Sequence, residues 1–182
     1  ISDNSGIFNA FTMNDMTSYY EYLPANKIEI AMDIESDRMQ NSSFNPAEFK
    51  SEIEVIKQER RMRSESQASG IMRETMNSLA FISSQNRDPI IGWPGDLDHM
   101  TRDEAYTYYK TYYTPNNSFL VLIGDFNTDE MLKLVEKYYG NIPRGPEVPD
   151  VWVIEETQKV RKSFTLVHTD ITEPGIRMAF HS

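Results

Sequence analysis

The segment that most constrains this chain is a helix predicted between residues 46 and 64. Its start carries three separate signals: Asn45 as the N-cap, Pro46 at the first helical position, and Glu48 three residues after the cap. The pattern continues to about Ser64, where residues 66–70 introduce serines and a glycine that end it.

Two acidic residues of this helix have a spacing that matters for chemistry. Glu52 and Glu59 are seven residues apart, which is about two helical turns, so both carboxylates lie on one face. Such a face can supply a ligand to a metal that another helix also holds. The alternative is a solvated face on which acidic and basic residues balance each other. The spacing alone leaves both interpretations open.

Composition restricts the class of protein. With 182 residues, 39% of them hydrophobic, the chain can bury one sizeable core, or one core and part of another. A net charge of -10 argues against nucleic acid as a partner, and no apolar run has the length of a membrane span. The absence of cysteine excludes disulfides and thiolate metal sites. It fits the cytosol or an exported bacterial protein. The sequence therefore leaves the compartment open, and we favour the bacterial periplasm slightly over the cytoplasm.

Both ends of the sequence have the character of strands. The chain opens at Ile1 without an initiator methionine, and residues 175–181 alternate like a strand. We therefore expect an internal piece of a longer protein, in which any targeting signal lies upstream.

The order of predicted elements indicates an α+β fold in which helices cover one face of an antiparallel sheet. A hairpin is predicted over residues 8–13 and 17–23. Further helices are expected at 27–39, 71–81, 105–113 and 129–139, strands at 118–123, 162–168 and 175–181, and irregular structure at 83–100. We expect one domain over residues 1–145, a proline-rich linker at 146–160, and the opening strands of a similar domain at 161–182.

Several motifs in register resemble the pitrilysin/insulinase family of zinc metallopeptidases, which includes the mitochondrial processing peptidases. They cover residues 6–145 in the family's order. The matching motifs are Asn9-Ala10-Phe11-Thr12, Asp15-x-Thr17-x-Tyr19-Tyr20, Glu35-x-Asp37-Arg38-Met39, Glu52-x-x-Val55-Ile56-x-x-Glu59-Arg60-Arg61, Pro89-Ile90-Ile91-Gly92, Tyr112-Tyr113-x-Pro115-x-Asn117 and Val121-Leu122-Ile123-Gly124-Asp125.

The resemblance implies roles for the two glutamates. In that family a His-x-x-Glu-His motif supplies two zinc ligands and the general base, and a glutamate on a second helix is the third ligand. By this resemblance Glu59 is the zinc ligand. Glu52 is the accompanying carboxylate, a candidate catalytic residue that supports the site. A catalytic zinc takes three protein ligands and keeps one position open for water, which fits this assignment.

The chain departs from the family in one respect, because it contains no His-x-x-Glu-His motif. Its histidines are His99, His168 and His181, and none is close to another in the sequence. Two of the three ligands and the base are therefore missing. We expect zinc in the intact protein and none in this fragment, which we predict to be inactive by itself. We also expect the Glu59 side chain to face inward, toward the missing ligands.

The first predicted strand has two possible roles. By resemblance, Asn9, Ala10 and Phe11 lie on a sheet edge beside the metal, where an extended peptide substrate pairs with the backbone. The alternative is an ordinary strand in which Phe11 packs in the core and Asn9 caps a turn. The sequence leaves both open, since it does not show which strand is an edge.

The resemblance implies a parent enzyme that hydrolyses peptide bonds with zinc-activated water. Its partners would be peptide or unfolded protein substrates, and a family member in a homo- or heterodimer. The alternative is a non-catalytic family member that serves as a partner subunit or peptide-binding module. Retention of both Glu52 and Glu59 favours the enzyme.

Overall fold

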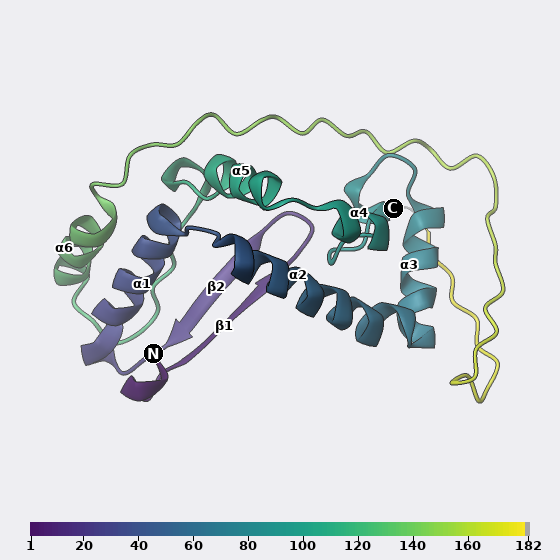
Figure 1. Cartoon of the computed structure of the whole chain (residues 1–182), viewed down its shortest axis with the longest axis horizontal. Helices are drawn as coiled ribbons and strands as arrows, with labels where there is room; N and C mark the ends of the chain where they lie inside the picture. The colour runs from purple at the N-terminus through teal and green to yellow at the C-terminus, as the bar shows by residue number, and fades with distance from the viewer. Residues whose placement is uncertain (181–182) are drawn as a thin grey trace. The chain divides into compact units, whose positions relative to one another are not determined.

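The computed structural model describes residues 1–180, so His181, the last residue of the predicted 175–181 strand, lies outside the described residues. The chain divides into two compact units. Unit 1 contains Ile1–Asn45 and Thr101–Pro149, and unit 2 contains Pro46–Met100 and Asp150–Ser182. The course of the chain through both units is shown in Figure 1. The predicted domain limits at residues 145 and 161 stay a prediction.

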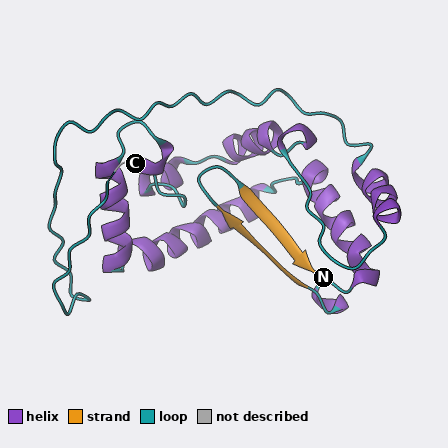
Figure 2. Cartoon of the chain, turned by 180° about the vertical axis from the view of Figure 1, so that it is seen from behind, coloured by secondary structure: helices purple, strands orange, loops and turns teal. Residues whose placement is uncertain are grey.

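A β-hairpin opens unit 1, as the sequence predicts. Strands β1 (Ile7–Thr12) and β2 (Thr17–Tyr22) pair antiparallel, from Ile7 opposite Tyr22 to Thr12 opposite Thr17. A short turn closes the hairpin, with the Met13 N–H donating to the Met16 carbonyl at 2.8 Å. Figure 2 shows the two strands as a pair of arrows. All six residues of β1 are exposed, whereas the middle of β2 is half-buried.

Three helices complete unit 1: α1 (Ile28–Asn41), α5 (Arg102–Tyr112) and α6 (Thr128–Tyr139). The predicted capping box of α5 is present, with Thr101 and Glu104 each bonding the other's backbone N–H. Asn127 caps α6 by accepting from the backbone of residues 129 and 130. These local signals explain why the predicted helices and the observed ones agree within a few residues.

The core of unit 1 lies between the hairpin and α1 and α5. The Tyr19 hydroxyl of β2 is 3.2 Å from the Tyr113 hydroxyl, and the Arg38 guanidinium lies over the Tyr19 ring at 4.3 Å. Tyr109, which is buried, donates to the Arg38 carbonyl at 2.9 Å. Met32 of α1 is buried as well. The arrangement confirms the predicted α+β class, with helices on one face of an antiparallel sheet.

Unit 2 is built from α2 (Pro46–Arg60), α3 (Ala68–Ala80) and the short α4 (Pro94–His99). The predicted 46–64 helix is confirmed, but its last turn, Arg61–Glu65, is π-helical. Helix α4 lies inside the 83–100 stretch that we predicted to be irregular. Its proline is at the first helical position, where the missing N–H costs nothing and the fixed φ suits a helix. Short 3-10 turns occupy Ser2–Asn4, Ala25–Lys27, Gln85–Arg87 and Pro115–Asn117.

Three predicted strands do not form among the described residues. Segments 118–123, 162–168 and 175–180 carry no strand assignment, because no neighbouring strand pairs with them within residues 1–180. Their apolar side chains are exposed: Phe119 is 81% accessible, Ile123 93% and Val167 90%. A β-strand needs a partner for its backbone groups, and a local apolar pattern does not supply one.

Candidate functional site

The two predicted site glutamates lie on the flank of α2. The buried positions of this helix are Ile53 and Arg60, which are also seven residues apart. Glu52 and Glu59 each precede one of them, so they lie about 100° around the helix from the buried stripe. Glu52 is exposed, and the Glu59 side chain is 36% accessible. The shared face predicted from the spacing is therefore a solvent-accessible flank that borders the packed side of α2.

The Glu59 carboxylate has an exposed arginine as an ion-pair partner. Its Oε1 accepts an ion pair from Arg63 Nη1 at 2.7 Å, but the Arg63 side chain is 74% exposed. Exposed pairs of this kind contribute about 0.2–1 kcal/mol, so exchange of the arginine for a dication would cost little. A carboxylate oxygen is also an ordinary zinc ligand. The donor set thus fits zinc at one coordination position.

Residues 1–180 do not complete a metal site by themselves. They contain no group of three or more His, Cys, Asp or Glu side chains arranged to hold a metal ion. His99, predicted in a loop, ends α4, and its Nδ1 lies 2.7 Å from the Gly95 carbonyl. His168 Nδ1 lies 3.4 Å from Asp170. His181 is outside the described residues.

The residue after Glu59 forms a buried ion pair that the sequence analysis missed. The Arg60 Nη1 and Nη2 atoms donate to the two carboxylate oxygens of Glu74 on α3, both at 2.8 Å. Arg60 is 3% exposed, and its guanidinium lies 5.9 Å from the ring centroid of Trp93. The sequence-based interpretation gave Arg60 no role of its own. The seven-residue spacing from Ile53 was the signal that placed it on the packed side.

The π-helical turn that follows Arg60 packs tightly against the start of α3. A Cβ at Gly70 would lie 2.5 Å from the Arg63 carbonyl oxygen and 2.7 Å from the Ser64 Cα, so only glycine fits there. Ser64 is buried in this contact. The end of α2 is therefore fixed by side-chain pairing at Arg60 and by close backbone packing one turn later.

The hairpin residues singled out from the sequence lie on an open strand. The Asn9 side-chain oxygen accepts from the Ala10 N–H at 2.8 Å. Phe11 is 41% exposed, with its ring centroid 6.2 Å from that of Tyr20 on the neighbouring strand. Within residues 1–180, β1 pairs with β2 alone, so its other edge is open.

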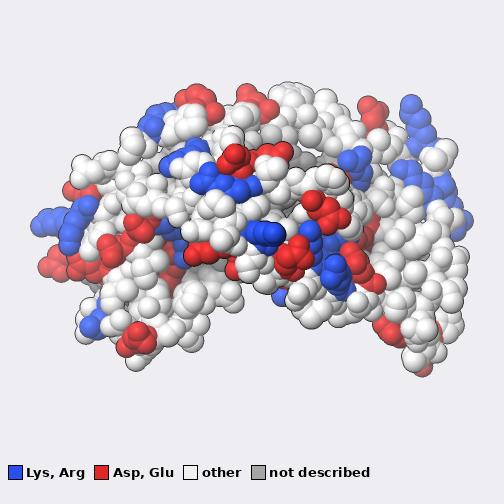
Figure 3. All heavy atoms as spheres, viewed as in Figure 1, with Lys and Arg blue, Asp and Glu red and all other residues white. Residues whose placement is uncertain are grey.

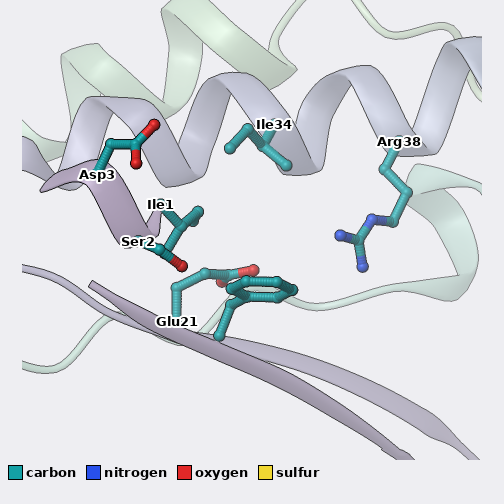
Figure 4. A pocket seen from close by; sticks show the side chains of 7 residues that line it. Ile1, Ser2, Asp3, Glu21, Ile34 and Arg38 are labelled. Atoms are coloured by element: carbon teal, nitrogen blue, oxygen red, sulfur yellow. The ribbon is translucent and has the colours of Figure 1, made fainter. Parts of the chain in front are cut away.

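A pocket of about 390 Å³ lies between the hairpin and α1 in unit 1. Glu21 of β2 and Arg38 of α1 point into this space, as Figure 4 shows. Burial, together with a hydrogen bond and the negative charge from Glu35, raises the pKa of Glu21 to about 7, while Arg38 acts in the opposite direction. Burial also raises the pKa of Tyr139 to about 12, with the charges of Glu35 and Glu21 adding to the effect.

The surface shows mixed charge. On the face drawn in Figure 3, acidic and basic side chains are interspersed, although the chain as a whole carries a net charge of -10. Among the described residues, no helix combines the length and the apolar character needed to cross a bilayer.

Two family models match consecutive parts of the chain. Residues 1–92 match the model described as "Insulinase (Peptidase family M16)". Residues 99–182 match the model described as "Peptidase M16 inactive domain". Helix α2, with Glu52 and Glu59, lies within the first match.

Relatives and solved structures agree with these matches. The chain is 26% identical over 86% of its length to the probable mitochondrial-processing peptidase subunit beta of Arabidopsis thaliana, and covers 29% of that protein. It is 23% identical over 91% of its length to the zinc protease PqqE of Helicobacter pylori, and covers 37% of it. It thus spans about a third of these relatives.

Among solved structures, a protease from Helicobacter pylori matches 85% of this chain with a TM-score of 0.82 at 21% identity, over 38% of its own length. The first half of the periplasmic protease PqqL from Escherichia coli matches 83% of this chain with a TM-score of 0.73 at 21% identity, over 33% of its own length. These likenesses establish the fold. The family model over residues 1–92, half of the chain, shows that this chain belongs to the insulinase family of peptidases, family M16.

Proposed function

We propose that the intact protein containing this chain is a zinc-dependent metalloendopeptidase and that Glu59 is one of its zinc ligands. The observation that carries the proposal is the placement of Glu52 and Glu59 on the accessible flank of α2. The family relatives that are named zinc proteases support the same reaction class. The fragment supplies one ligand of the three that a catalytic zinc requires, so we expect no activity from it alone.

Glu59 and Glu52 of α2 would have different roles in the zinc site. Glu59 would leave its exposed arginine partner and hold the metal through one carboxylate oxygen. Glu52, two turns earlier on the same face, adds negative charge that favours a bound cation and orients groups near it. When bound, zinc supplies Lewis-acid chemistry and lowers the pKa of a coordinated water. The other two ligands and the general base would come from a His-x-x-Glu-His segment upstream of Ile1.

We propose that β1 binds the substrate through its backbone. An extended peptide can pair with the open edge of β1 and gain hydrogen bonds that do not depend on its sequence. The Ala10 N–H, which now donates to Asn9, would donate to a peptide carbonyl instead. Asn9 and the exposed Phe11 are then the side chains that face the substrate, which would be a peptide or an unfolded protein.

A second candidate function has its own supporting observation. Residues 99–182 match a model described as an inactive domain, and a relative is a subunit of the mitochondrial-processing peptidase. Under this second proposal, the intact protein is a non-catalytic partner subunit in a dimer with a family member. The sequence of the roughly 80 residues before Ile1 separates the two functions: a His-x-x-Glu-His motif there supports the enzyme, and its absence supports the partner subunit.

We further propose a periplasmic location in a bacterium. A structural neighbour of this chain is described as a periplasmic protease, and a cysteine-free chain is compatible with export. Fractionation of cells that express the intact protein tests this directly, with recovery in the periplasmic fraction as the expected result.

The experiment that tests the enzyme is Glu59→Gln in the intact protein, followed by measurement of zinc content and peptide hydrolysis. The amide keeps the shape but is a much weaker ligand, so both are expected to fall at least 10-fold. Glu54→Gln is the matched control, because Glu54 is an exposed glutamate of the same helix that pairs with Lys57 at 3.1 Å. Wild-type zinc content and hydrolysis in Glu59→Gln would refute the assignment.

A further inference from the structure

We propose that Arg60 is a positioning residue for the zinc ligand Glu59, and that it acts through its buried ion pair with Glu74. The inference rests on the proposed function, since it assigns Arg60 a role toward a metal that Glu59 would bind. It concerns a contact inside unit 2, where α2 and α3 meet.

The geometry of the pair fixes orientation as well as distance. Both terminal nitrogens of Arg60 donate to the two oxygens of Glu74, each at 2.8 Å, which is the bidentate arrangement. The side chains are 4% and 15% exposed, so water does not loosen the pair. A planar fork against a planar carboxylate restricts rotation about the axis of α2 in a way that a single contact does not.

The position of Arg60 in the chain couples this restriction to Glu59. The two residues are neighbours in the last turn of α2, and the regular helix ends at Arg60. Any rotation or shift of that turn therefore moves the Glu59 carboxylate with it. Zinc–oxygen distances vary by only about 0.2 Å between good sites, so the ligand tolerates little movement.

Two further side chains, Trp93 and Glu65, lie beside the guanidinium. The Trp93 ring lies beside it, and the indole N–H of Trp93 donates to Asp88 at 2.9 Å, which holds the ring in place. Glu65, at the end of the π-helical turn, lies 3.3 Å from the Arg60 Nε. Gly70 allows the backbone of that turn to approach α3 closely. The end of α2 next to Glu59 is thus supported by contacts to the Arg60 side chain and by the close packing of the following turn against α3.

A purely structural role for Arg60 gives a different expectation. Loss of a buried pair would then lower stability, and the molecules that remain folded would bind zinc as before. A positioning role instead changes the metal site in the folded protein. The two are separated by a metal readout measured at a temperature where the variant is folded.

The test uses Arg60→Lys in the intact protein, since lysine keeps the charge and loses the bidentate fork. We expect zinc affinity, measured by competition with a chelator, to fall about 10-fold. The visible absorption of the cobalt(II)-substituted protein, which reports ligand geometry, should change as well. Arg144→Lys is the control, because Arg144 pairs with Glu147 at 2.6 Å on an exposed surface. It should leave both readouts unchanged.

A double variant shows whether Arg60 acts through Glu59. Arg60→Lys should lower zinc affinity in the wild-type background and have little further effect when Glu59 is already glutamine. If Glu59→Gln by itself leaves zinc affinity unchanged, the proposed function fails. If Glu59→Gln lowers affinity and Arg60→Lys lowers only the unfolding temperature, the positioning role is overturned and the function stands.

A second variant covers the case in which Arg60→Lys does not fold. Glu74→Asp keeps both charges and shortens one side chain by a methylene group, so the pair can close only by drawing α2 and α3 together. The same loss of zinc affinity and the same change in the cobalt spectrum are expected. An unchanged cobalt spectrum and zinc affinity in folded Glu74→Asp would contradict the proposal.

Discussion

Helix α2 and strand β1 are suited to two different kinds of binding. Helix α2 presents side chains at defined angles, and its end is anchored by the buried pair of Arg60 and Glu74. Strand β1 presents an open backbone edge, and all its residues are exposed. The comparison indicates that a metal ligand needs a rigid support, while peptide binding needs an accessible edge with few side-chain requirements. Variants in the two elements should therefore affect different measurements.

The largest effect is expected in α2. Glu52→Gln should lose less zinc than Glu59→Gln but reduce the rate of peptide hydrolysis by the intact protein about 10- to 100-fold, because the carboxylate that supports the site loses its charge. Zinc content and kcat are the measurements, with Glu54→Gln as the control. Loss of zinc to the extent seen with Glu59→Gln would show that Glu52 is itself a ligand and would change its assigned role.

A smaller effect is expected in β1. Ala10→Pro removes the N–H that would bond a peptide carbonyl, and proline is tolerated on an edge strand. One hydrogen bond contributes about 1 kcal/mol, so KM should rise about 5-fold while zinc content stays the same. Ala10→Val, which keeps the N–H, is the control. A fall in zinc content with Ala10→Pro would contradict the claim that β1 affects peptide binding and α2 affects metal binding.

The smallest effect concerns the inner side of the hairpin, where Glu21 faces Glu35. Carbon-13 NMR of the Glu21 carboxyl should give a pKa of about 7, and Glu35→Gln should bring it down toward the ordinary value. A raised folded-state pKa stabilises the fold below the unfolded-state value of 4.5, and this contribution is lost as the pH rises through 7. Glu21→Gln should therefore remove the pH dependence of stability between those values. Titration of Glu21 near pH 4.5 would contradict the burial seen here.

The sequence predicted the elements that carry local signals. The hairpin has its two strands four residues apart, α5 has its capping box, and α2 begins at Pro46 as expected. The sequence-based prediction was wrong where the formation of a strand depends on a pairing strand from elsewhere in the chain. Residues 118–123 have the composition of a strand but no strand pairs with them in the described part of the chain. A local pattern records neither the presence nor the absence of such a partner.

The same distinction applies to the site. The spacing of Glu52 and Glu59 placed both on one face of α2, and the structure agrees. The contacts beside that face could not be predicted from the sequence. Arg60 pairs with Glu74, which is fourteen residues later and on another helix. The π-helical turn after Arg60 has no composition signal either, and it depends on the close approach that Gly70 permits. Candidate ligands can thus be predicted from spacing, whereas their supports depend on tertiary packing.

The most direct test of the central claim is the distance between zinc and the Glu59 carboxylate in a crystal structure of the zinc-loaded intact protein. Zinc should lie about 2.0–2.2 Å from one Glu59 oxygen, with Arg63 released from its pair and the Arg60–Glu74 pair unchanged. A zinc ion bound without Glu59, with the Glu59 side chain still on Arg63, would contradict the account.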